Sequence, residues 1–222
     1  EESPAITICK NKLSQISLTF QEFARQDSNK MYPPPEDNDV FFYLNMKALR
    51  NAIKFDEYQF WCPNREEDIN SELEFIKAYK TGESFPNSTS YIYLPHGVTS
   101  ETDGLAYLAA FEKAIIEGKT TISDLIGEDG TIFNLHSLPL STGPNASKTV
   151  LLFEDTWYHG GRCESAHFVG GNVLYLDGHV EFLTCGEFPF TESFLSELDA
   201  LPKRQIDRTL KSLGRDDLVG QF

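Results

Sequence analysis

The chain has 222 residues, of which 40% are hydrophobic and 24% are charged, so it is long enough for one large globular domain with a buried core. Acidic residues outnumber basic residues 34 to 19, and the formal net charge is −15. Phosphate backbones and anionic lipid surfaces repel such a chain, which excludes nucleic acid as an expected partner.

The N-terminal end of the sequence passes from Glu1-Glu2-Ser3-Pro4 directly into a helical pattern. No stretch of the chain approaches the roughly 20 uninterrupted apolar residues that cross a bilayer, and no signal peptide is visible. We therefore expect that a targeting or anchoring segment precedes this sequence in the full-length protein.

The first predicted element is an amphipathic helix that begins near Ile6 and ends before Tyr32. Its apolar residues recur in steps of three and four, as one face of an α-helix requires, and only Leu18 breaks the pattern. The prolines that follow Tyr32 cannot continue a helix. The apolar stripe consists of Ile6, Cys9, Leu13, Ile16, Phe20 and Phe23.

The middle of the chain alternates helical and extended patterns. Helices are predicted over residues 40–55, 65–79 and 103–117, and a strand of alternating aromatic and aliphatic residues over 90–94. Gly118 is placed to end the third of these helices. The residues expected to face a core are Phe41, Leu44, Leu49 and Ile53 in the first helix, and Leu105, Leu108, Phe111 and Ile115 in the third.

The best local signal is a β-hairpin in the last third of the chain, after a buried strand predicted over residues 149–153. Strands over 172–176 and 179–183 are joined by Asp177-Gly178, a dipeptide suited to a two-residue type I′ turn. That turn places Tyr175 opposite Val180 and Val173 opposite Phe182. We expect the apolar face so formed to pack on the first helix.

The C-terminal tail is predicted as two helices, over residues 193–201 and 205–213, that form a peripheral appendage. With the preceding elements, these helices predict an α+β fold. A long N-terminal helix would pack on an antiparallel sheet, because a narrow apolar stripe buries well on one sheet face and leaves a polar back.

Three segments, in this order, resemble prepilin-type proteins of planctomycete, verrucomicrobial and lentisphaeral bacteria. The segment from Cys9 to Leu18 resembles their C-x-N-x-L-K-Q-I-G-L stretch. Phe60-Trp61-Cys62-Pro63 is similar to their F-x-C-P, and Ser90-Tyr91 to the strand that follows it. His167, nine residues and then Asp177-Gly178 resemble the processing-associated domain that is named for this spacing.

The sequence departs from this pattern at two positions. Ser14 stands where the family often has lysine, and Lys30 where an Asp-Gly pair commonly precedes Tyr-Pro. The second departure speaks against a calcium loop at that point. An acidic surface can hold divalent cations such as calcium through oxygen ligands, but no spacing in the chain defines such a site, so no cofactor is predicted.

The resemblance implies a type IV pilin-like or pseudopilin-like fold in a single domain over residues 1–222. Residues 1–30 would be the remnant of the first helix, 95–148 an insertion, 149–190 the sheet with its hairpin, and 191–222 a helical tail. The missing half of the first helix would be apolar, processed by a prepilin peptidase and held in the inner membrane. The rest of the chain would then lie in the periplasm or at the cell surface, with other pilin-like subunits or secretion machinery as partners.

The four cysteines fit two disulfides in an exported protein. Cys9 and Cys62 sit in two family-like motifs, and Cys163 and Cys185 flank the hairpin. We predict the pairs Cys9–Cys62 and Cys163–Cys185, although four cysteines permit three connectivities. Four free thiols in a cytosolic protein are the alternative.

The hairpin region also holds candidates for metal and ligand binding. His159, Cys163 and His167 are spaced four apart, with Cys185 as a fourth zinc ligand, but Gly160 and Gly161 argue against the continuous helix that would align them. Zinc is therefore not expected. Trp157 and Tyr158 could form an aromatic platform for a sugar or a neighbouring subunit, and burial in the core is favoured over this.

No catalytic residues can be named. His167 is expected to hydrogen-bond backbone near the start of the hairpin, and Asp177 to serve as a turn residue. A nucleophile elbow, a His-Glu-x-x-His motif and a phosphate loop are all missing from the sequence. We thus expect a structural or assembly subunit rather than an enzyme. The alternative is a membrane-anchored module of the same fold that binds glycans or exported proteins.

Overall fold

The computed structural model describes residues 4–28, 30–33, 46–60, 91–98, 100–117, 146–154, 170–184, 186–188 and 192–220. Its elements in chain order are α1 (Pro4–Gln26), α2 (Met46–Ala52), the 3-10 helix η1 (Glu57–Phe60), β1 (Tyr91–Val98), α4 (Glu101–Ile116), β2 (Val150–Glu154), β3 (Gly170–Tyr175), β4 (Val180–Thr184), α5 (Glu192–Ser212) and the 3-10 helix η4 (Asp216–Leu218). The content is mixed α+β, as predicted. Among the described helices, none has both the length and the apolar character that a membrane span requires.

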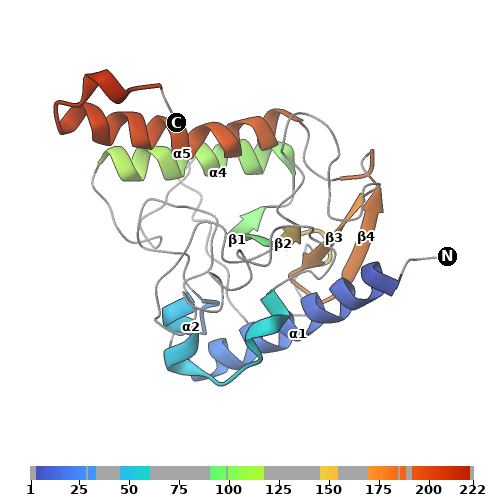
Figure 1. Ribbon diagram of the computed structural model, residues 1–222. Helices are drawn as coiled ribbons and strands as arrows, with labels where there is room; N and C mark the ends of the chain where they lie inside the picture. The colour runs from blue at the N-terminus through green and yellow to red at the C-terminus, as the bar shows by residue number, and fades with distance from the viewer. Residues whose placement is uncertain are drawn as a thin grey trace.

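The strands form one antiparallel sheet with the order β1-β2-β3-β4. Helix α1 contacts β3 and β4, whereas α4 contacts β1 and carries α5 on it. In Figure 1 the sheet lies between α1, drawn below it, and the α4–α5 pair, drawn above it. The N-terminal helix therefore packs on an antiparallel sheet, and the predicted helical insertion and helical tail pack against each other.

The apolar stripe of α1 is buried as the sequence predicts. Five of its six residues are buried and Phe23 is partly buried, while Leu18 keeps 64% of its surface exposed. Phe20 packs edge-on against Tyr93 of β1, with ring centroids 5.2 Å apart. Leu152 and Leu174, which face each other across β2 and β3, belong to the same cluster. The core therefore lies between α1 and the sheet.

Short segments close the end of this core. Leu49 and Ile53 are buried as predicted, although the helix there spans only Met46–Ala52 within the described residues. Gln59 of η1 donates to Thr19 Oγ1 of α1 at 3.1 Å, a buried side-chain hydrogen bond that holds η1 on the helix. Phe41, Leu44 and the predicted helix over 65–79 lie outside the described residues.

The hairpin pairs one residue out of the predicted register. Leu174 lies opposite Val180, Val173 opposite Glu181, and Asn172 opposite Phe182. Because adjacent side chains point to opposite faces of a sheet, this shift changes which residues meet α1. Leu174 and Val180 pack in the core cluster with α1, and Val173 is buried on the other face.

The tail forms one helix where two were predicted. Helix α5 runs without a break through Pro202, at which the sequence pattern indicates an interruption. Contacts with α4 lie on both sides of this proline, at Phe194 and at Arg204, and they hold the two halves in line. Tertiary packing thus overrides the local preference of proline.

Candidate functional site

Of the motif from His167 to Gly178, the structure describes residues 170–178, which form β3 and the tip of the β3–β4 hairpin that rests on α1. The Tyr175 amide donates to the His179 carbonyl at 3.0 Å, and the Gly178 amide donates to the Tyr175 carbonyl at 2.9 Å. The loop therefore holds three residues rather than two, and only Gly178 adopts a positive φ, of 90°. This is the geometry of a three-residue hairpin loop with glycine in the left-handed position.

The side chain of Asp177 explains why the tighter turn does not form. Its Oδ1 accepts the backbone N–H of His179 at 3.1 Å and lies 2.5 Å from Nδ1 of the same histidine. An aspartate that accepts from the amide two residues ahead stabilises an ordinary turn, so Asp177 keeps a negative φ. Asp177 is thus a turn residue, as predicted, although in a different turn.

An aromatic pair faces away from α1 at the hairpin tip. The rings of Tyr175 and His179 are stacked, with centroids 4.3 Å apart and planes 6° apart. Burial, and secondarily the charges of Glu181 and Asp177, raise the pKa of Tyr175, so its hydroxyl stays protonated at neutral pH. The stacked ring and the Asp177 carboxylate together fix the orientation of His179.

On its other side the tip contacts polar residues of α1. A Cβ on Gly178 would lie 3.2 Å from Ser17 Oγ and 3.8 Å from Gln21 Nε2. Ser17 is buried there and accepts from Gln21 at 3.4 Å. Glycine is therefore favoured by its backbone conformation, and a larger residue would also press on the Ser17 side chain.

We expect that Gly178→Ala lowers the free energy of unfolding by about 1–3 kcal/mol, because alanine is strained at positive φ. Urea unfolding followed by circular dichroism measures this change. Gly186→Ala is the matched control, since nothing lies within 4 Å of its Cβ position and its φ is not positive. That variant should stay within about 0.5 kcal/mol of the parent chain. Equal stability of the two variants would contradict the left-handed conformation of Gly178.

A buried polar row crosses the sheet and was not predicted. Tyr91 pairs with Glu154 across β1 and β2, and Asn172 of β3 donates to Glu154 Oε1 at 2.9 Å. All three side chains are buried, and burial together with the Glu154 charge raises the pKa of Tyr91 well above 10. In the sequence, the buried row is marked only by Glu154, which follows the apolar residues of β2. One glutamate at the end of an apolar run does not indicate that its side chain is buried.

The remaining predicted site residues divide into two groups. Cys9 is fully buried in α1 and is disulfide-bonded, which removes the alternative of four free thiols. Its predicted partner Cys62 lies outside the described residues, so the pairing stays a prediction. The other predicted site residues that lie there are Trp157, Tyr158, His159, Cys163, His167 and Cys185. The described residues contain no group of three or more metal-ligating side chains.

The chain matches no family model, no curated protein and no solved structure.

Proposed function

We propose that this chain is the extracytoplasmic part of a type IV pilin-like or pseudopilin-like subunit, with a structural or assembly role in a pilus-like or type II secretion-like system. In the full-length protein, α1 would continue toward its N-terminus as an apolar helix anchored in the inner membrane. The observation that carries the proposal is the packing of the α1 stripe on an antiparallel sheet whose Asp177-Gly178 hairpin contacts Ser17.

The outward side of α1 supports a role in assembly. Positions 8, 11, 15, 18 and 22 are spaced three and four apart, so they form one stripe opposite the sheet, and all five are exposed. Ile8 and Leu18 in this stripe expose 46% and 64% of their surface. Large apolar residues presented on a rigid helix suit contact with a neighbouring subunit.

The disulfide of Cys9 supports the proposed compartment. Disulfides persist in the periplasm and at cell surfaces, whereas cytosolic thiols are kept reduced. A fully buried, bonded cysteine in the first helix also fits a subunit whose helix must stay attached to the rest of the domain under mechanical load. Cys9 thus supports both the proposed extracytoplasmic location and the proposed structural role.

Site-specific photo-crosslinking in cells that express the full-length protein tests the proposal. A photoreactive residue at position 18 should yield adducts with a second copy or with other pilin-like subunits. Position 213 is the matched control, because Leu213 on the tail is a leucine of similar exposure, at 69%. Adducts at position 213 alone would contradict an assembly role of α1.

The native gene gives an independent test. We expect its upstream sequence to encode a short basic leader, a prepilin cleavage site and an apolar helix that is continuous with α1. An ordinary cleavable signal peptide would reject the pilin-like proposal. In that case, a positive glycan array or pull-down with the 222-residue chain would favour an extracytoplasmic binding module.

A further inference from the structure

Helices α4 and α5 run in the same direction and meet at two places. Near their N-terminal ends, the ring of Phe194 packs against Gly104, where an added Cβ would lie 2.6 Å from the ring. Toward their C-terminal halves, Glu112 of α4 contacts Arg204 and Arg208 of α5. The first contact is apolar and fully buried at Phe194, and the second is ionic and partly exposed.

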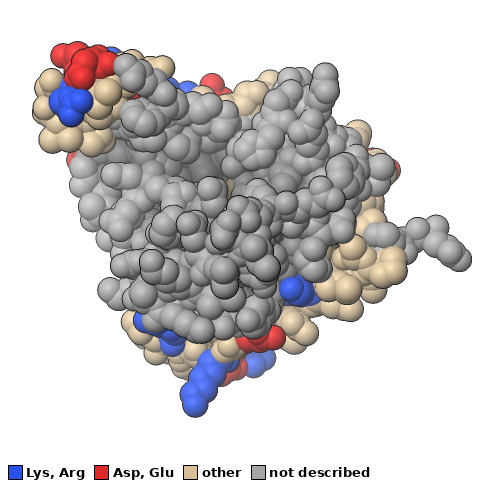
Figure 2. All heavy atoms as spheres, viewed as in Figure 1, with Lys and Arg blue, Asp and Glu red and all other residues tan. Residues whose placement is uncertain are grey.

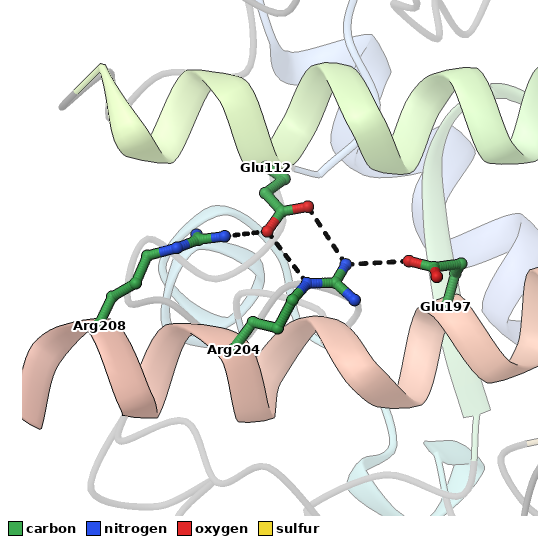
Figure 3. Close-up of polar contacts among 4 residues, drawn as sticks. All are labelled: Glu112, Glu197, Arg204 and Arg208. Carbon is green, nitrogen blue, oxygen red and sulfur yellow. Dashed lines mark hydrogen bonds and ion pairs between the residues drawn. The ribbon is translucent and has the colours of Figure 1, made fainter. Parts of the chain in front are cut away.

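One carboxylate joins the second half of α5 to α4 (Figure 3). Arg204 donates to both oxygens of Glu112, from Nε at 3.1 Å and from Nη2 at 3.2 Å. Arg208 donates to Oε1 of the same residue, while its Nη1 is buried without a hydrogen-bond partner among the described residues. Arg204 also binds Glu197 of its own helix at 2.9 Å. Both arginines therefore meet α4 at the same carboxylate.

Pro202 lies between the two contacts. Proline has no backbone N–H, so one hydrogen bond of the helical ladder is missing there. Among the described side chains, Phe194 contacts α4 from residues 192–201, and the two arginines contact it from residues 203–220. The C-terminal end of α5 projects at the upper left of Figure 1 before the chain turns back over the helix, and Figure 2 shows acidic and basic side chains at that corner. The second half of α5 thus begins where one backbone hydrogen bond is missing. It contacts α4 through the ion pairs of Arg204 and Arg208.

We propose that residues 203–220 form a strap that swings away from α4 about Pro202, and that the Glu112 carboxylate holds the strap closed. Gly104, Leu108 and Glu112 are spaced by four and lie along one stripe of α4. Leu108 in this stripe is buried between the Gly104 and Glu112 contacts. This proposal is independent of the proposed function.

Acid opens the strap because it discharges Glu112. Burial raises the pKa of Glu112, but the hydrogen bonds from Arg204 and Arg208 outweigh it and place the pKa below the ordinary value of 4.5. The groups that face the carboxylate are these two arginines, with Glu197 behind Arg204. A group with a lowered pKa stabilises the closed strap fully above pH 4.5, and this stabilisation is lost as the pH falls through the folded-state pKa.

Hydrogen exchange on the whole chain at pH 7 tests the proposal. In Glu112→Gln, amides 205–213 should exchange at least about tenfold faster, since two charge-assisted contacts are lost. Amides of β2 and β3 should not change. In the parent chain, exchange over 205–213, corrected for intrinsic exchange, should accelerate toward the Glu112→Gln rate as the pH falls from 4.5 through the lowered pKa of Glu112, and Glu112→Gln should show no such pH step.

Two further variants separate the hinge from the ionic contact. Glu197→Gln removes a carboxylate that binds Arg204 within α5 only, so it should change exchange less than Glu112→Gln. Pro202→Ala restores the missing amide and should reduce the acceleration that Glu112→Gln causes. Unchanged exchange over 205–213 in Glu112→Gln, or equal acceleration in β3, overturns the strap. No effect of Pro202→Ala overturns the hinge.

Discussion

Leu13→Ala should lower the free energy of unfolding by about 2–5 kcal/mol, because it deletes a fully buried side chain between α1 and the sheet. The loss has two parts, the transfer of the removed methyl groups and the cavity that their neighbours cannot refill. Urea unfolding monitored by fluorescence and circular dichroism measures it. The slope of the transition should not change, since the variant exposes nearly the same surface on unfolding.

Leu18→Ala provides the matched control for this prediction. It makes the same chemical change five residues further along the same helix, but Leu18 is 64% exposed. Its effect should stay within about 0.5 kcal/mol. Similar losses in the two variants would mean that α1 does not lie on the sheet with its predicted face, and the proposed function would lose the observation that carries it.

The sequence predicted α1 well because periodicity is the strongest local signal of an amphipathic helix. Apolar residues at 6, 9, 13, 16, 20 and 23 can share one face only in a helix, and the structure buries that face. The exposure of Leu18 also follows from the spacing. A pattern that repeats over several turns predicts the buried face of a helix better than any single residue does.

The hairpin was predicted in place but not in register, because a dipeptide does not determine a turn. Asp177-Gly178 fits a two-residue turn, in which both residues have positive φ, and equally a three-residue loop, in which only glycine does. The hydrogen bond from the His179 amide to Asp177 favours the second. Such a contact depends on the residue after the turn, which the dipeptide rule ignores.

Two other features lay beyond local reasoning because they depend on long-range contacts. The continuity of α5 through Pro202 is enforced from α4, whose sequence lies about ninety residues earlier. The buried row of Tyr91, Glu154 and Asn172 draws one residue from each of three strands. No periodicity within a single strand could indicate that these polar groups meet.

Cys9→Ala should lower the free energy of unfolding by about 2–5 kcal/mol through loss of its disulfide. A disulfide that joins α1 to a later segment reduces the conformational entropy of the unfolded chain. Its removal raises that entropy and so favours unfolding. The substitution also leaves the partner of Cys9 as a free thiol. Alkylation of the denatured, unreduced variant followed by peptide mass analysis should place the label on Cys62.

The energetics of a second substitution check the same pair. Cys62→Ala should cost about as much as Cys9→Ala, and the double variant little more than either, since both remove one bond. Cys163→Ala is the control, because Cys163 belongs to the other predicted bridge. Its loss in the free energy of unfolding should therefore add to that of Cys9→Ala. A label on Cys163 or Cys185 in Cys9→Ala would reject this pairing while leaving the bond itself intact. With Cys62 as the partner, the bond would join the Cys9–Leu18 segment to the Phe60–Pro63 segment. A disulfide between them would explain why both segments occur together in the sequence.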